Sequence, residues 1–200
     1  LPTSYALSRS NFSGKKPITI FYLITMFFGG GLIPYYVTIM QLGMINTFWV
    51  MVIPGAISAY NVIVFKTFFM SIPEALRESA SLDGAGHVRI LFQIVLPLSK
   101  AVLATFALFS IVGYWNDYMT ALLYLRDDTK YPIQLLMRRL LVLMDYKDAS
   151  TAQMLKDFQK ISTRTTKAAA TIITVVPVLC VYPFMQKHFA KGVLVGSIKA

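Results

Sequence analysis

Apolar residues in this 200-residue chain are gathered in long blocks rather than in short amphipathic repeats. A helix needs about 20 apolar residues to cross the roughly 30 Å hydrocarbon core of a bilayer. Four blocks meet that requirement, at about residues 17–40, 47–69, 99–123 and 168–185. The pattern therefore predicts an all-α fold, a polytopic transmembrane helical bundle that forms a single domain over residues 1–200.

The composition agrees with a membrane protein, since 56% of the residues are hydrophobic and only 14% are charged. Soluble globular domains carry about 25% charged residues, so a water-soluble domain of this length is disfavoured. The chain starts at Leu1 with neither the basic flank nor the cleavage site of a signal peptide. We therefore expect the sequence to be incomplete at its N-terminus, with one or more helices preceding Leu1.

The net charge of +10 raises the question of a nucleic-acid partner, but no motif for one is present and none is expected. Most basic residues lie instead at the ends of the apolar blocks. Because Lys and Arg accumulate on the cytoplasmic side of membrane proteins, we place residues 72–97 and the tail 188–200 in the cytoplasm and residues 126–167 outside. The basic residues behind this orientation are Arg9, Lys15, Lys16, Lys66, Arg77, Arg89, Lys100, Lys187, Lys191 and Lys199.

The polar segment 72–97 has the punctuation of two short helices joined by a turn. Pro73 suits a first helical turn, and Glu74 and Glu78 favour the positive end of the helix dipole. Gly84 and Gly86 are suited to ending that helix in a left-handed turn. A second helix is expected from about residue 87 to 95, before Pro97. An amphipathic helix lying on the membrane surface is the alternative, although such helices usually have a Lys/Arg-rich polar face.

This segment resembles the EAA loop of bacterial ABC importer permeases, whose pattern is Glu-Ala-Ala, Asp-Gly-Ala and Ile-x-Leu-Pro. Here the three parts are Glu78-Ser79-Ala80, Asp83-Gly84-Ala85 and Ile94-Val95-Leu96-Pro97, with a serine at the central alanine. The resemblance implies the type I importer permease fold and a coupling helix that docks in a cleft of an ATPase subunit. The residues that it implies for docking are Glu74, Glu78, Ser79, Ala80, Asp83, Gly84 and Ala85.

Further stretches are similar to the carbohydrate, maltose-type branch of these permeases, and nearest to those for complex or uronate oligosaccharides. They are Tyr5 to Arg9, Gly29 to Tyr35, Trp115 to Asp117, Tyr182 to Lys187 and Lys191 to Gly196. The resemblance implies oligosaccharide import across the bacterial cytoplasmic membrane. It also implies a second homologous permease in a heterodimer, two ATPase subunits, an extracytoplasmic solute-binding protein and contact with membrane lipid. The tail 188–200 is implied to reach into the ATPase dimer.

Two places are candidates for a substrate path. Gly30 and Gly31 precede Pro34 inside the first block, where broken helices line translocation paths or glycines allow close helix packing. Polar and aromatic residues interrupt the third block near its outer end, where they are suited either to contact sugar or to make structural hydrogen bonds. These residues are Tyr114, Trp115, Asn116 and Asp117.

The outer segment 126–167 shows helical spacing of apolar residues at Ile133, Leu136, Leu140 and Leu143. Arg138 and Arg139 on this helix, together with Lys130, are suited to an acidic sugar or to an acidic rim on the binding protein. A solvated cap without a ligand is the plainer alternative.

The chain has no Gly-x-x-x-x-Gly-Lys-Ser/Thr phosphate loop, no metal-ligand spacing and no nucleophile-base-acid set. We therefore expect no catalytic, cofactor or metal site here, and place ATP and Mg in the partner ATPase subunits. A permease for another solute class, a membrane-embedded enzyme and a channel subunit are the alternatives. An enzyme requires clustered catalytic residues and a channel requires a pore filter, and the sequence shows no pattern for either.

Overall fold

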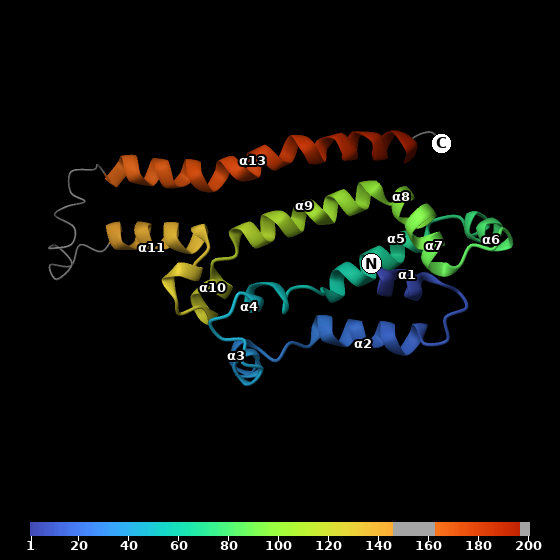
Figure 1. The fold of residues 1–200 in the computed structure, drawn as a ribbon, viewed down its shortest axis with the longest axis horizontal. Coiled ribbons are helices and arrows are strands. Elements are labelled where there is room, and N and C mark those ends of the chain that lie inside the picture. The colour runs from blue at the N-terminus through green and yellow to red at the C-terminus, as the bar shows by residue number, and fades with distance from the viewer. Residues whose placement is uncertain (146–162, 197–200) are drawn as a thin grey trace.

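The computed structural model describes residues 1–145 and 163–196, and this part of the chain consists of helices joined by turns and loops (Figure 1). The predicted all-α class is confirmed. The first half contains α1 (Pro2–Ser8), α2 (Lys15–Phe27), α3 (Leu32–Gln41), α4 (Trp49–Val52), α5 (Ala59–Met70) and α6 (Glu74–Leu82). The second half contains α7 (His87–Ile90), the π-helix η1 (Leu91–Val95), α8 (Leu96–Leu98), α9 (Lys100–Asn116), α10 (Met119–Tyr124), the 3₁₀-helix η2 (Asp128–Lys130), α11 (Ile133–Asp145) and α13 (Thr163–Gly196).

The long helices run between two ends of an elongated molecule. Helices α9 and α13 pack side by side, and α5 contacts both α1 and α2. Helices α6 and α7 form one end, which we call the inner end, whereas α10, η2 and α11 form the opposite, outer end. The segment 72–97 and the outer segment therefore lie at opposite ends of the molecule.

The helices that cross the length of the molecule are divided differently from the expected blocks. Within the described residues, one stretch, Thr165–Pro183 in α13, is long and apolar enough to span a membrane by itself. Two further spans are available only if bent pairs count as one, namely α2 with α3 at 115° and the helix 87–98 with α9 at 81°. The block 47–69 is divided into α4 and the shorter apolar helix α5.

Local chemistry accounts for both bends. Between α2 and α3, Gly31 adopts φ +81°, which a residue with a side chain rarely takes. At the second bend, Ser99 is buried and its hydroxyl donates to the carbonyl of Val95 at 2.6 Å. The helix that starts at His87 continues to Leu98 rather than ending at Val95, because Pro97 falls in the first turn after the π-helix, where a missing N–H is tolerated.

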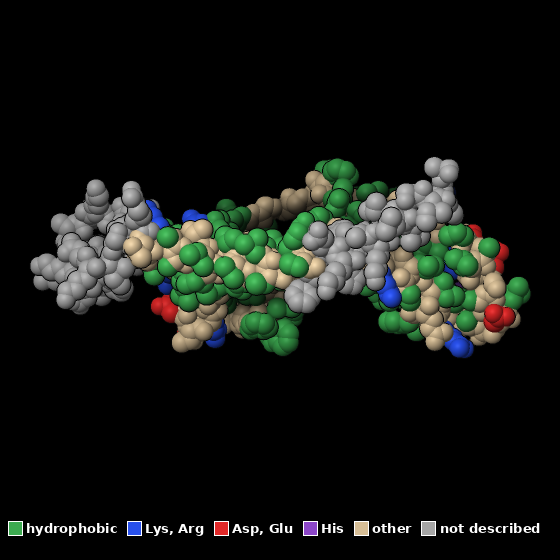
Figure 2. All heavy atoms as spheres, turned by 90° about the horizontal axis from the view of Figure 1, so that it is seen from above, with side chains coloured by type: hydrophobic (Ala, Val, Ile, Leu, Met, Phe, Trp, Pro, Cys, Tyr) green, Lys and Arg blue, Asp and Glu red, His purple; other side chains and the backbone are tan. Residues whose placement is uncertain are grey.

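Each end of the molecule has its own cluster of buried apolar residues, which packs the helices of that end against one another. The inner cluster consists of Tyr5, Phe65, Phe69, Ile72, Ile90, Leu91 and Val95. The outer cluster consists of Ile39, Val50, Ala121, Tyr124, Leu125 and Leu135. Figure 2 shows charged side chains toward the two ends of the visible face and hydrophobic side chains across its middle. A surface with this distribution is suited to lipid or to apolar partner subunits.

Candidate coupling loop and substrate path

Helix α6 ends in a complete Schellman turn. The amide of Gly84 donates to the carbonyl of Ser81 at 3.1 Å, and the amide of Ala85 donates to the carbonyl of Ala80 at 2.9 Å. Gly84 has φ +80°, so the turn uses the left-handed conformation that glycine adopts without strain. Gly86, also predicted to contribute to the turn, has an ordinary φ of −69°. The direction in which the chain leaves α6 therefore depends on Gly84.

The inner face of α6 is tied to the rest of the inner end. Arg77 is only 4% exposed and donates from Nη2 to the carbonyl of Ile72 at 3.1 Å. At the start of the helix, the Ser10 hydroxyl donates to Glu74 Oε1 at 3.3 Å. Ala80 and Ala85 pack against the inner cluster. These contacts join α6 to the α1–α2 loop and to the segment that follows α5, so the helix is attached as one body.

The solvent-facing sides of α6 and of the helix that follows it (α7 and η1) are not covered by other parts of the described chain. Leu82, Val88 and Phe92 are 89%, 71% and 62% exposed. The side chains of Glu78 and Asp83 are exposed on the same projecting loop, as are Glu74 and Ser79. Exposed apolar side chains mixed with carboxylates are characteristic of a protein docking surface. Of the predicted docking residues, Ala80 and Ala85 therefore face inward, while the others lie on the accessible side.

Sequence reasoning missed the burial of Arg77, which it treated only as a charge that orients the chain. One signal was present: Arg77 lies three residues before Ala80 and four before Ser81, which places the three on one helix face. The Ser81 hydroxyl donates to the backbone carbonyl of Arg77 at 2.9 Å. A long basic side chain on the small-residue face of a short helix is a sign that its stem is buried.

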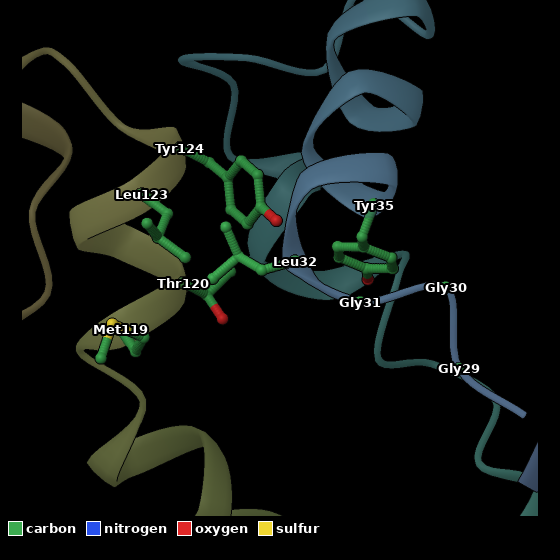
Figure 3. Close-up of a pocket in the computed structure, with 9 residues that line it drawn as sticks. All are labelled: Gly29, Gly30, Gly31, Leu32, Tyr35, Met119, Thr120, Leu123 and Tyr124. Atoms are coloured by element: carbon green, nitrogen blue, oxygen red, sulfur yellow. The ribbon is translucent and has the colours of Figure 1, made fainter. Parts of the chain in front are cut away.

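Gly30 and Gly31 lie at one edge of a cavity of about 470 Å³ between α3 and α10 (Figure 3). A Cβ on Gly29 or Gly31 would meet no atom of the described chain within 4 Å, so close packing inside this chain does not require these glycines. Gly31 is nevertheless required by its backbone conformation, since its φ of +81° is one that a residue with a side chain rarely adopts. In Figure 3 the side chain of Tyr124 lies on the α10 side and that of Tyr35 on the α3 side. The cavity is also lined by Leu32, Met119, Thr120 and Leu123.

The other candidate path residues line a different place. Tyr114 and Trp115 face a cavity of about 350 Å³ beside Pro177 of α13. The indole N–H of Trp115 donates to the carbonyl of Thr174 at 2.9 Å. Asp117 Oδ1 accepts from the amide of Thr120 at 3.0 Å and so caps the start of α10. Asn116 is the last residue of α9. The contacts of Trp115 and Asp117 favour the structural alternative over sugar contact.

The outer end is organised around Asn46, a residue that sequence reasoning did not single out. Its φ is +58°, and its Oδ1 accepts from the amides of Arg126 and Asp127 at 3.0 and 3.1 Å. The backbone amide of Asn46 donates to the Tyr124 carbonyl at 2.8 Å, and its backbone carbonyl accepts from Lys130 Nζ at 2.8 Å. Asparagine is one of the few residues with a side chain that tolerates this conformation. The presence of Gly43 and Asn46 in a short uncharged turn was therefore the sequence signal for a left-handed residue at this place.

The loop that contains η2 carries its own polar contacts. The hydroxyl and amide of Thr129 both donate to Asp127 Oδ1, and these hydrogen bonds hold the pKa of the Asp127 carboxyl below its usual value. Arg139 Nη1 lies 2.9 Å from Asp128 Oδ1 and its Nη2 donates to the Tyr131 hydroxyl at 3.0 Å. The predicted outer helix begins at Ile133, in α11; Leu143 and the segment 146–162 lie outside the described side chains.

The inner tail falls partly outside the described residues. Helix α13 continues to Gly196, so residues 188–196 extend the last helix, and residues 197–200 lie outside the description. The side chains of residues 184–196 are likewise not described, so the predicted entry of this tail into an ATPase dimer stays a prediction.

Comparison with known proteins gave one family and several relatives. The sequence model of the family described as "Binding-protein-dependent transport system inner membrane component" matches residues 11–195. Over 98% of its length, the chain is 43% identical to the "Polygalacturonan/rhamnogalacturonan transport system permease protein YtcP" of Bacillus subtilis (strain 168), of which it covers 68%. It is 40% identical to "Protein LplC" of the same organism, again over 98% of its length, and covers 66% of that protein.

A solved structure shares the fold. It is described as the "Crystal structure of a bacterial ABC transporter involved in the import of the acidic polysaccharide alginate". The match has a TM-score of 0.83 at 31% identity and covers 94% of this chain and 66% of the solved one. The chain therefore spans about two thirds of the length of the proteins it matches.

Proposed function

Because the chain belongs to the family of binding-protein-dependent transport system inner membrane components, we propose that it is the permease subunit of an ATP-driven oligosaccharide importer. The family match and the structural match confirm the predicted ABC importer permease fold and the location in the inner membrane. Members of this family are transport components rather than enzymes. The chain accordingly supplies a path and a docking surface, and ATP with Mg belongs to partner ATPase subunits.

The observation that carries the proposal is the projecting loop formed by α6, the Gly84 turn and α7. One side of this loop is bonded to the chain beside it, through Arg77 to the carbonyl of Ile72 just after α5 and through Glu74 to Ser10 in the α1–α2 loop. Its other side exposes apolar side chains such as Leu82 and carboxylates such as Asp83. A body attached on one side and exposed on the other is suited to transmit a rigid-body movement across an interface. Closure of an ATPase pair would therefore move α6 and α5 together.

The proposed assembly contains this chain, a second homologous permease, two ATPase subunits and an extracytoplasmic solute-binding protein. Large apolar side chains in the α2–α3 region support contact with lipid and with a second permease, since Phe27, Phe28 and Ile33 are 73%, 78% and 75% exposed. We propose a heterodimer of permeases, as is implied by the resemblance to sugar importers.

The substrate class is supported by relatives whose names specify carbohydrate transport. These include the polygalacturonan/rhamnogalacturonan permease protein and the "Galactooligosaccharides transport system permease protein GanQ" of Bacillus subtilis (strain 168), which is 33% identical over 98% of this chain. We propose that an oligosaccharide passes this subunit, with the Gly30–Gly31 loop as one wall of the path. Import of another solute class is the alternative.

Co-purification in mild detergent from the native membrane tests the proposal. We expect recovery of an ATPase pair and a second permease, with ATP hydrolysis stimulated by one binding protein when it is loaded with oligosaccharide. Recovery of the chain alone, without nucleotide hydrolysis, would contradict the importer assignment. Stimulation only by a binding protein loaded with a non-sugar solute would retain the importer and reject the substrate class.

A further inference from the structure

A further cavity, with both polar and apolar residues in its lining, lies at the outer end between Tyr118, α11 and α13, and we call it the outer pocket. Its volume is about 430 Å³, within the range of about 300–1,000 Å³ that small-molecule sites occupy. Tyr118 precedes α10, Gln134 and Arg138 lie on α11, and Thr171 and Thr174 lie on α13. This end of the molecule is opposite the coupling loop (Figure 1). The pocket is separate from the cavity beside Gly30 and from the cavity beside Trp115.

Arg138 supplies the positive charge of the outer pocket. Its guanidinium carbon lies 4.3 Å from the centroid of the Tyr118 ring, so the guanidinium is held over the ring face. Among the side chains that the structure describes, no carboxylate forms an ion pair with it, whereas the adjacent Arg139 is paired with Asp128. Stacking fixes the guanidinium plane and leaves its N–H edges available to a planar anion, which a carboxylate can accept in bidentate fashion.

Gln134 adds a second donor to the same wall. Its Nε2 is buried and has no hydrogen-bond partner in the described part of the chain. Gln134 lies four residues before Arg138, so both side chains occupy one face of α11. Buried polar atoms in proteins are normally hydrogen-bonded, and an orphaned donor in a cavity therefore points to an acceptor that a ligand would bring.

The α13 wall supplies acceptors. The Thr171 hydroxyl donates to the Lys167 carbonyl at 2.9 Å, and the Thr174 hydroxyl donates to the Thr171 carbonyl at 3.0 Å. Both hydroxyl protons are thus engaged, and the oxygens keep lone pairs that can accept from a ligand hydroxyl. A cation and an amide donor on one wall, with hydroxyl acceptors on the other, match a sugar that carries both a carboxylate and free hydroxyls.

We propose that the outer pocket binds one carboxylated sugar unit, a uronate, of the transported oligosaccharide, with Arg138 on its carboxylate and Gln134 on a neighbouring oxygen. This inference rests on the proposed function and adds the substrate class to it. An acidic side chain of the binding protein is the alternative occupant, and the experiment below distinguishes the two. The pocket would hold the acidic unit while the oligosaccharide passes from the binding protein to the permease.

The test measures binding of trigalacturonate to the purified, fully assembled complex without binding protein, by saturation-transfer NMR. Its control ligand is the same trisaccharide with the carboxyls reduced to alcohols. Arg138→Gln should weaken trigalacturonate binding by about tenfold or more, the effect of losing a charge-assisted hydrogen-bonded pair. The matched variant Arg139→Gln, next to it on α11, should bind like the wild type. The reduced trisaccharide should bind weakly, and equally to all three proteins.

Equal binding of trigalacturonate to the wild type and to Arg138→Gln would overturn the proposal, as would no difference between the acidic and the reduced trisaccharide. A weaker affinity of Arg138→Gln for the binding protein, with unchanged sugar binding, would also overturn it in favour of a protein contact. Stimulation of ATP hydrolysis by loaded binding protein, measured on the same wild-type complex, tests the importer function separately. That stimulation can persist even if the outer pocket binds no uronate.

Discussion

Gly84 at the inner end and Asn46 at the outer end both adopt the left-handed conformation, and they differ in whether they have a side chain. At the inner end Gly84 has φ +80° and no side chain, and an added Cβ there would meet no atom within 4 Å. At the outer end Asn46 has φ +58° and a side chain that accepts two backbone amides. The turn at Gly84 therefore leaves its surroundings open, as a surface for a partner would, whereas the turn at Asn46 is the centre of an internal hydrogen-bond network.

The difference is consistent with the roles that we propose for the two ends. The inner end keeps its helices together by apolar packing around Phe69 and Ile90 and leaves its outward surface to be covered by a partner. The outer end binds its own loops together through Asn46 and leaves cavities beside them. Similar local backbone conformations thus occur at the proposed docking surface in one place and at the centre of a hydrogen-bond network in the other.

The strongest test of this contrast is Gly84→Val. A residue with a Cβ pays about 1–2 kcal/mol in the left-handed conformation, and valine is among the least tolerant. Because space around Gly84 is open, the cost arises from the backbone, and the Schellman turn should change direction. We expect sugar uptake to fall by about tenfold or more while the protein still reaches the membrane.

Gly86→Ala is the matched control, since Gly86 has φ −69° and open space for a Cβ. It should leave uptake close to that of the wild type. Normal uptake by Gly84→Val, at a normal membrane level, would remove the coupling turn from the mechanism.

The corresponding change at the outer end is Asn46→Ala, which loses both the side-chain acceptor and the tolerance of a positive φ. We expect thermal unfolding of the purified complex in detergent to reveal a loss of about 2–4 kcal/mol. Asn46→Gly keeps the backbone conformation and should lose about 1–3 kcal/mol, from the two hydrogen bonds that its side chain accepts. If both variants unfold like the wild type, the network around Asn46 does not hold the outer end.

Trp115→Phe tests whether the polar and aromatic residues 114–117 make structural hydrogen bonds or contact sugar. The variant removes the hydrogen bond to the Thr174 carbonyl and should destabilise the complex by about 1–2 kcal/mol. Trp49, which is 60% exposed, offers the control: Trp49→Phe should change stability by less than about 0.5 kcal/mol. A Trp115→Phe variant with full stability but a raised KM for the loaded binding protein would favour sugar contact instead.

The smallest expected effect belongs to Asp128→Asn. The pair between Asp128 and Arg139 is short, but both side chains are substantially exposed, at 76% and 45%. Exposed pairs of this kind contribute about 0–1 kcal/mol and are weakened by salt. Thermal unfolding should therefore shift only slightly at low salt and not at all at high salt. A shift as large as that of Asn46→Gly would mean that the Asp128–Arg139 pair stabilises the outer end as much as the hydrogen bonds of Asn46 do.

Much of this arrangement was predictable from local sequence. The pattern around Pro73, Glu78 and Gly84 predicted a helix, a left-handed turn and a second helix, because propensity, capping and glycine act over a few residues. The apolar blocks predicted a helical membrane protein for the same reason that hydropathy works, namely that lipid requires internally bonded backbone.

Other features depend on contacts between distant segments and left no local pattern. The orphaned Nε2 of Gln134 arises only once separate helices meet. Likewise, Arg138 and Arg139 look equivalent in the sequence, and only the fold assigns one to the outer pocket and the other to Asp128. The bend between α2 and α3 was partly signalled by the glycines, but not its angle.

That bend bears on how the chain enters the membrane. Helices α2 and α3 have 13 and 10 residues, so at 1.5 Å per residue they are about 20 and 15 Å long, and neither alone crosses a hydrocarbon core of about 30 Å. If α2 and α3 together form one span, they enter the bilayer as a single apolar segment that is bent at Gly29–Gly31. Such a bend would then be fixed by the packing of the loop against α10 when the bundle assembles, rather than by insertion itself.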